Sequence, residues 1–143
     1  METINRGLRQ DTFKEIVLDF NNAPFAQLAG FKLTEVGNGT ATIELQAERK
    51  LLNSANILHG GVSAALCDTA MGFAVKSLGT ISIVTAEMKI NYLVPIKFGE
   101  KVKAIGRVVK AGQNLCVAEG EIINEENQVA AKSLGTYFVL KNS

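Results

Sequence analysis

The chain is short of several residue types, and each shortage narrows what the protein can be. Its 143 residues include no tryptophan, one histidine, two prolines and two cysteines, and fifteen basic residues nearly balance fourteen acidic ones. A formal net charge of +1 gives no electrostatic reason to expect nucleic acid or an anionic membrane as a partner. No apolar run approaches the roughly 18–20 residues of a membrane span, and the first residues lack the apolar segment of a secretory signal. These absences predict a cytoplasmic protein that binds neither nucleic acid nor membrane.

The two cysteines exclude two further classes of protein. Cys67 and Cys116 lie far apart, each in an apolar stretch, and neither belongs to a Cys-x-x-Cys or Cys/His pattern. Their spacing therefore indicates neither a zinc site nor a disulfide framework. We expect two buried free thiols in a reducing compartment, and we expect no metal and no bound cofactor.

The hydrophobic pattern predicts helical structure near the N-terminus. Phe13, Ile16, Val17 and Phe20 recur at spacings of three and four, which is typical of one buried helical face. This helix is expected over residues about 11–20, because the residue before Pro24 avoids helical backbone angles. Residues 24–30 are expected to form a turn or a second short helix.

The rest of the chain resembles strands, apart from one long apolar helix. Residues 31–47 alternate around a Gly-Asn-Gly turn, as in a hairpin, and four strand-like stretches with short connections follow residue 79. Residues 51–61 are expected to form a long loop that leads into a helix at about 61–77. We therefore predict a single α+β domain over residues 1–143, in which an antiparallel sheet of five or six strands wraps around one long central helix.

The predicted central helix is apolar on nearly every face, which indicates burial all round. Its only charged residues are Asp68 and Lys76. An ionised carboxylate removed from water costs several kcal/mol unless it is paired or faces a wet cavity. Asp68 is therefore either a structural residue, bonded to a neighbouring strand or to solvent at an oligomer seam, or a base or nucleophile in a cleft.

The start of this helix offers a second candidate feature, the triplet His59-Gly60-Gly61. Glycines allow a substrate to approach the backbone closely, and the first N–H groups of a helix lack intrahelical partners. Such donors, aided by the helix dipole, can hold the oxyanion that forms during acyl transfer. The lone histidine is either part of this site or a hydrogen-bonded structural residue.

The spacing of these two features points to more than one subunit. Gly60 and Asp68 are eight residues apart, which corresponds to about 12 Å of helix, too far for both to act on one carbonyl within a chain. Two helices packed antiparallel across a twofold axis would bring them together. Small residues would permit that approach; they are Ala64, Ala65, Ala70 and Gly72. We therefore predict a homodimer with active sites at the interface.

Three stretches of the chain carry a family resemblance: LLNSANILHGGVSAALCDTAMGFA, TAEMKINYLVPIKFGEKVKAIGRVVKAG and the terminal GTYFVL. They combine an asparagine six residues before a histidine, the triplet HGG, and an aspartate nine residues after that histidine. On these motifs, residues of about 25–140 resemble the PaaI-like hotdog-fold acyl-CoA thioesterases. The resemblance implies a hotdog fold, a dimer with interface active sites, and pairing of dimers into a homotetramer.

The resemblance also implies roles for individual residues. Gly60 would supply the backbone N–H that polarises the thioester carbonyl, and Asp68 of the partner subunit would act as general base or nucleophile. Asn53 and His59 would position the water or the thioester group. Thr85 matches a Ser/Thr position that in relatives contacts the catalytic water from the other chain.

Substrate-binding residues are predicted on the same basis. Gly61, Leu58 and Met71 are expected to bind the substrate. The wider set that could line the acyl pocket, which core packing explains equally well, is Leu51, Leu52, Ile57, Leu58, Met71 and Phe73. The basic residues that could reach the phosphates of coenzyme A, each also explained as a solvated strand residue, are Lys89, Lys97, Arg107 and Lys110.

The leading hypothesis is a homo-oligomeric thioesterase that hydrolyses an aryl- or medium-chain acyl-CoA to the free acid and coenzyme A, which is part of the substrate. A non-catalytic hotdog that binds acyl-CoA as a sensor or scaffold is the alternative, and it predicts binding without turnover. The third hypothesis is a hotdog dehydratase that acts on 3-hydroxyacyl thioesters. Analysis of the products distinguishes dehydration from hydrolysis.

Overall fold

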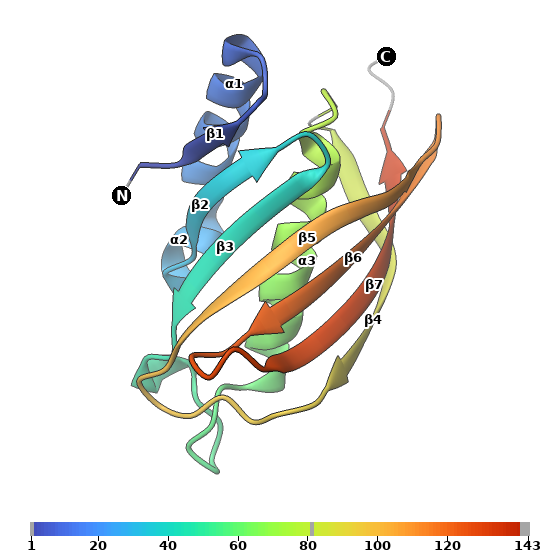
Figure 1. The fold of residues 1–143 in the computed structure, drawn as a ribbon. Coiled ribbons are helices and arrows are strands. Elements are labelled where there is room, and N and C mark those ends of the chain that lie inside the picture. The colour runs from blue at the N-terminus through green and yellow to red at the C-terminus, as the bar shows by residue number, and fades with distance from the viewer. Residues whose placement is uncertain (1, 81, 141–143) are drawn as a thin grey trace.

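The computed structural model describes residues 2–80 and 82–140, and its centre is a long helix lying against one face of a curved sheet (Figure 1). Residues 1, 81 and 141–143 lie outside the described residues, so the predicted domain limits of 1 and 143 stay predictions. The helices are α1 (Gln10–Asn21), α2 (Pro24–Ala29) and α3 (Gly60–Lys76), with a short 3-10 turn at Arg49–Leu51. The strands are β1 (Ile4–Arg6), β2 (Lys32–Gly37), β3 (Thr40–Gln46), β4 (Ile83–Tyr92), β5 (Lys101–Ala111), β6 (Leu115–Ile123) and β7 (Val129–Val139).

The sheet in the described ranges has seven strands in the order β1-β2-β3-β5-β6-β7-β4, so the predicted five or six strands were too few. The additional strand is β1, which pairs parallel with β2, whereas all other pairs are antiparallel. Three residues are too few to produce a readable alternation, which is why the pattern missed β1. The α+β architecture with one long helix is as predicted.

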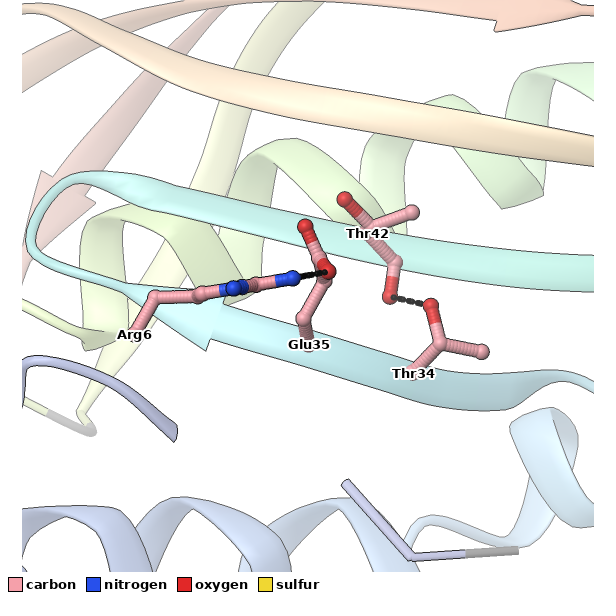
Figure 2. Close-up of polar contacts among 4 residues, drawn as sticks. All are labelled: Arg6, Thr34, Glu35 and Thr42. Atoms are coloured by element: carbon pink, nitrogen blue, oxygen red, sulfur yellow. Dashed lines mark hydrogen bonds and ion pairs between the residues drawn. The ribbon is translucent and has the colours of Figure 1, made fainter. Parts of the chain in front are cut away.

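Polar contacts fasten this first edge of the sheet (Figure 2). The Arg6 guanidinium lies 3.0 Å from a carboxylate oxygen of Glu35 on β2. Thr34 is the extra residue of a bulge between Leu33 and Glu35, and its hydroxyl donates to the Thr42 carbonyl at 3.2 Å. Because both partners of the ion pair are exposed, we expect it to contribute less than about 1 kcal/mol. The edge is therefore held mainly by backbone pairing.

Strand β4 does not lie where short connections predict it. A simple meander would place β4 beside β5, but β4 forms the opposite edge of the sheet, next to β7 (Figure 1). Residues 93–100 carry the chain along one end of the sheet to β5, and the Leu58 N–H donates to the Ile96 carbonyl there at 2.7 Å. This detour leaves one side of β4 without a strand partner in the described chain.

Helix α3 begins and ends one residue earlier than predicted, and it lies unusually close to the sheet. A Cβ on Gly106 of β5 would overlap the main chain at Ala70, so only glycine permits this approach. Leu66, Cys67 and Met71 are fully buried against the sheet. The prediction of burial all round was wrong for the first half of the helix, where Gly61 is exposed and neighbouring residues are only partly covered.

The N-terminal helices cover the second half of α3. Helix α1 extends one residue further at each end than predicted, and α2 confirms the short-helix alternative for residues 24–30. Phe20 packs edge-on against Phe73 with ring centroids 5.4 Å apart, and Lys76 pairs with Asp19 at 2.7 Å. The two halves of α3 therefore have different surroundings. No helix in the described part of the chain combines the length and apolarity needed to cross a membrane.

Candidate active site

The Asp68 carboxylate is held by two hydroxyl groups from the sheet. Its Oδ1 accepts a hydrogen bond from Thr85 Oγ1 at 2.8 Å and another from Tyr137 Oη at 2.9 Å. The Tyr137 hydroxyl also lies 3.1 Å from the main-chain oxygen of Asp68. No group among residues 2–80 and 82–140 bonds to Oδ2. Asp68 thus bonds a neighbouring strand, as a structural residue would, but it also keeps one carboxylate oxygen available for chemistry.

The sheet register explains why these two hydroxyls meet at one carboxylate. Thr85 on β4 and Tyr137 on β7 are directly opposite partners, so their side chains project from the same face of the sheet. A bulge follows immediately, between Thr85 and Glu87. Bulges commonly occur next to active sites, where they redirect side chains. The helix and the edge of the sheet together therefore orient Asp68.

Tyr137 was not among the residues predicted from sequence. It is almost fully buried, and burial, followed by the negative charge of Asp68, raises its pKa far above the usual range for tyrosine. The phenol consequently keeps its proton and acts as a donor. The signal that could have found it is general: a buried tyrosine needs a polar partner for its hydroxyl, and Asp68 is one of only two charges in the helix.

A cavity of about 220 Å³ opens beside Asp68. Its walls come from the α1–α2 connection, helix α2, the second half of α3, and strands β4 and β7. They comprise Ala23, Phe25, Ala26, Asp68, Thr69, Gly72, Phe73, Lys76, Ile83, Thr85 and Tyr137. Of the residues predicted for the acyl pocket, only Phe73 lies here. The cavity is mainly apolar, with the carboxylate of Asp68 in its wall.

The start of α3 forms a second cluster, and the first turn of the helix has a single open backbone donor. The Gly61 N–H is bonded to Nδ1 of His59 at 2.8 Å, and the N–H groups of Val62 and Ser63 are bonded to the His59 carbonyl at 2.9 and 3.2 Å. The Gly60 N–H has no partner within the described ranges. His59 therefore has the structural role left open above, as a helix cap. The Gly61 N–H is therefore already used within the cluster, and the expected binding of substrate by Gly61 stays a prediction.

Tyr92, a second residue missed by the sequence analysis, holds Gly60 in place. Its hydroxyl donates to the Gly60 carbonyl at 2.8 Å. A Cβ on Gly60 would lie 3.2 Å from the Tyr92 ring, which is closer than ordinary contact. Tyr92 thus packs where a side chain on residue 60 would otherwise lie.

Asn53 belongs to the same cluster, although its carbonyl oxygen is already used. Oδ1 accepts hydrogen bonds from the N–H groups of Ala55 at 2.9 Å and Ile57 at 3.3 Å. These bonds shape a tight loop in which Asn56 has a φ of 61°. The side-chain amide of Asn53 has no partner in the described part of the chain, which leaves two donors for a ligand.

A larger cavity, of about 430 Å³, lies beside Gly60. Its lining comprises Asn53, Ile57, Leu58, Gly60, Ser63, Tyr92, Leu93, Val94, Pro95, Ile96 and Ala130. The predicted substrate-binding residue Leu58 is therefore well placed, and so is Ile57. Leu51 and Leu52 line neither this cavity nor the one beside Asp68.

Met71 lies in neither cavity, because it belongs to the core. It is fully buried, and its sulfur accepts a hydrogen bond from the Ser133 hydroxyl at 3.5 Å under the sheet. The prediction that Met71 binds substrate is therefore wrong for this structure. Met71 lies three residues after Asp68 on α3. The difference in direction around the helix axis is small, but it points the Met71 side chain into the core and not into the cavity.

Cys67 and Cys116 are both buried and free, as predicted. Burial raises the pKa of the Cys67 thiol to about 11; the charge of Asp68 acts in the same direction and a hydrogen bond with Ser133 opposes both. A thiol with so high a pKa is a poor nucleophile near neutral pH. Asp68 is therefore a better candidate for the reacting group than its neighbour.

The two clusters share no lining residue, which agrees with the separation inferred from the eight-residue spacing. The basic residues predicted for phosphate binding do not gather near either one. Lys97 is the nearest to the Gly60 cluster, since it forms an isolated bridge with Ile57. Lys89 lies on β4, Arg107 and Lys110 lie on β5, and Arg107 faces Glu121 at 3.9 Å.

Comparison with known proteins identifies the family. The model of the thioesterase superfamily matches residues 55–131, more than half of the chain. A putative esterase of Saccharolobus solfataricus, SSO1253, is 32% identical over 115 residues that cover 80% of this chain and 76% of the relative. The acyl-coenzyme A thioesterase PaaI of Escherichia coli is 27% identical over 112 residues, 78% of this chain and 79% of that protein.

Solved structures agree with these matches. The structure of E. coli PaaI superimposes with a TM-score of 0.89 over 96% of this chain and 99% of the other, at 23% identity. The protein smu.793 of Streptococcus mutans, solved with acetyl CoA bound, gives a TM-score of 0.75 at 30% identity over 78% of this chain and 90% of the other. The chain belongs to the thioesterase superfamily, and within it to the PaaI-like hotdog thioesterases. The predicted fold family and enzyme class, a thioester hydrolase, are confirmed.

Proposed function

We propose that this thioester hydrolase cleaves acyl-CoA, using Asp68 of one protomer and the Gly60 N–H of its partner on the same carbonyl group. The observation that carries the proposal is the Asp68 carboxylate, which is fixed through Oδ1 by two hydroxyls and open at Oδ2 beside a cavity. Coenzyme A as the thiol is supported by the acyl-CoA thioesterase PaaI and by the acetyl CoA bound to the streptococcal relative.

The chemistry needs one group that handles a proton and one that stabilises negative charge. Asp68 removes a proton from water as the water oxygen bonds to the thioester carbonyl carbon, and the carbonyl oxygen becomes negative. The Gly60 N–H and the positive end of the α3 dipole stabilise that oxyanion. The carbon–sulfur bond then breaks, and the thiolate of coenzyme A leaves and takes up a proton. Direct attack by Asp68, through an anhydride that water hydrolyses, uses the same groups.

Two surfaces support a homodimer as the functional unit. The first half of α3 is only partly covered, although Val62, Ala64 and Ala65 are apolar. Strand β4 is an edge strand whose flank carries exposed Val84 and Tyr92. Apolar helix faces and long open strand edges are normally covered in native proteins. A twofold axis here would cover both and would place the Gly60 of one chain near the Asp68 of the other. Dimers would pair again into a homotetramer.

The acyl group would occupy the cavity beside Asp68. At about 220 Å³ this cavity is smaller than the roughly 300 Å³ at the lower end for drug-sized ligands, and Phe25 and Phe73 supply flat apolar walls. Both features favour an aryl- or medium-chain acyl group. His59 and Asn53 would position the water or the thioester group. His59 would do so by capping the Gly61 N–H, and Asn53 would do so through its free side-chain amide. The two buried free thiols suit the cytoplasm, where we place the enzyme.

The test is release of coenzyme A from a panel of phenylacetyl-, hydroxybenzoyl-, hexanoyl- and palmitoyl-CoA, followed with a chromogenic disulfide. We expect Asp68→Asn to lower kcat by about 10³-fold, because general base catalysis typically contributes about 10²–10⁴-fold. Asp11→Asn, a change of the same chemistry at an exposed site on α1, should behave as the wild type.

Three results would overturn the proposal in different ways. An Asp68→Asn protein with unchanged kcat/KM would remove Asp68 from the mechanism. Binding of acyl-CoA without release of thiol by the wild type would make the protein a sensor or scaffold. An enoyl thioester product would make it a dehydratase.

A further inference from the structure

The contacts of Tyr137 extend the proposed site beyond the residues that the sequence motif contains. We propose that Tyr137 is a positioning residue for Asp68: with Thr85 it fixes Oδ1, so that Oδ2 is the oxygen that reacts. The inference rests on the proposed function and specifies which carboxylate oxygen acts and what holds it. Tyr137 would act on the reaction through Asp68, although it also forms part of the cavity wall.

The geometry distinguishes the two oxygens of the carboxylate. Tyr137 Oη and Thr85 Oγ1 approach Oδ1 at 2.9 and 2.8 Å, whereas Oδ2 has no partner within residues 2–80 and 82–140. Two donors from adjacent strands on one oxygen prevent rotation of the carboxylate, because rotation would break both bonds. A base or nucleophile held in one orientation reacts faster than one that samples several.

A glycine on β7 makes room for the Tyr137 ring, so the position of the ring is built into the fold. A Cβ on Gly72, one helical turn after Asp68, would meet the ring at an ordinary contact distance of 3.7 Å. A Cβ on Gly135, two residues before Tyr137 on the same face of β7, would lie 3.1 Å from the ring and 3.3 Å from its hydroxyl. The ring can therefore lie over the helix, where its hydroxyl contacts Oδ1 and the main-chain oxygen of Asp68.

The electrostatic surroundings keep Tyr137 a donor rather than an acid. Its hydroxyl donates to the Asp68 carboxylate, and the buried Cys67 thiol and the Thr85 hydroxyl also act on its pKa. Only the hydrogen bond with Thr85 lowers that pKa, and burial together with the charge of Asp68 outweighs it. Burial and the Asp68 charge raise the pKa of Tyr137. Its contribution is therefore constant over the working pH range, which is the behaviour of a positioning group.

The test compares Tyr137→Phe with Ser133→Ala. The first keeps the buried ring and removes one hydroxyl from Asp68, while the second removes a buried hydroxyl on the same strand that contacts Gly120 and Met71 instead. We expect Tyr137→Phe to lower kcat by about tenfold, since a hydrogen bond to a charged group is lost, and to leave KM within about twofold. Ser133→Ala should keep the wild-type kcat. An unchanged kcat in Tyr137→Phe, or an equal loss in both variants, would overturn the proposal.

A second measurement does not depend on activity. The ¹³Cγ resonance of Asp68, assigned by its absence in Asp68→Asn, should shift in Tyr137→Phe and not in Ser133→Ala. If the wild type hydrolyses no thioester but this shift occurs, the proposed function fails and the Tyr137 contact stands. If the wild type is active and neither kcat nor the resonance changes, the thioesterase stands and the role of Tyr137 is wrong.

Discussion

The two halves of α3 offer different chemistry, and they are built in different ways. At the start of the helix the candidate group is a backbone N–H at Gly60. Its neighbours in sequence, His59 and Gly61, form the cap beside it, and Tyr92 of β4 holds its carbonyl. In the middle of the helix the candidate group is the Asp68 side chain, and hydroxyls 17 and 69 residues away orient it. A group whose charge stays fixed can be prepared locally. A group that must exchange a proton needs surroundings assembled from several elements of the fold.

Replacing the N–H at the start of the helix is the strongest challenge to this comparison. Gly60→Pro removes the open backbone donor, and the backbone of His59, with φ −58° and ψ 133°, already suits a residue before proline. We expect kcat to fall by about 10²-fold, as is usual when an oxyanion donor is lost. Steady-state kinetics with the best substrate of the panel measures it.

Gly60→Ala is the matched control, because it adds the same Cβ near Tyr92 and keeps the N–H. A smaller loss in Gly60→Ala than in Gly60→Pro assigns the effect to the donor. Equal losses would mean that crowding against Tyr92, and not the missing N–H, reduces the activity.

Mixing two inactive variants tests whether the two halves act across subunits. Asp68→Asn chains keep Gly60, and Gly60→Pro chains keep Asp68. If each site uses Asp68 from one chain and Gly60 from the other, random pairing leaves about a quarter of the sites intact. The activity of the mixture would then be about 25-fold above that of the Gly60→Pro parent. Co-refolding of the two variants, followed by thiol release, measures this gain.

Refolded mixtures of each variant with itself provide the baseline for this experiment. Activity that never exceeds this baseline would show that both residues act within one chain. Light scattering on the same samples reports whether dimers and tetramers form.

The smallest effect is expected at the local cap. His59→Ala removes the acceptor for the Gly61 N–H and should lower the free energy of unfolding by about 1 kcal/mol, the usual cost of losing a helix cap. His59→Asn supplies another good capping side chain and should restore most of it. Urea unfolding measures both. If His59→Asn were as unstable as His59→Ala, the histidine would stabilise the protein by something other than the cap.

Much of the fold was readable because it depends on periodicity and turns. The apolar spacing of α1, the Gly-Asn-Gly hairpin and the long apolar α3 all follow local rules. The strand count failed at β1, which is too short for a pattern, and the position of β4 failed because nothing in its own residues says which edge it occupies. Pairing between distant strands is a property of the whole sheet.

The residues of the candidate site show the same difference between local patterns and contacts made by the fold. His59, Gly60 and Asp68 were predicted from their types and positions, because a charge in an apolar helix and the start of a helix are visible in a sequence. Asn53 was predicted from the family resemblance. Tyr137 and Tyr92 were missed and Met71 was misplaced, because the direction of a side chain depends on which neighbour it packs against.

The sequence by itself determined that one helix would carry both a free N–H at its start and a carboxylate in its apolar middle, eight residues apart, because helix starts and isolated charges follow from local composition. Only the tertiary structure decided that Thr85 and Tyr137 would both donate hydrogen bonds to Oδ1 of Asp68 and leave Oδ2 free. The physical reason is register: hydroxyls on two strands meet at one carboxylate only after the sheet has aligned β4 with β7 and the glycine of β5, Gly106, has let the helix pack close to the sheet.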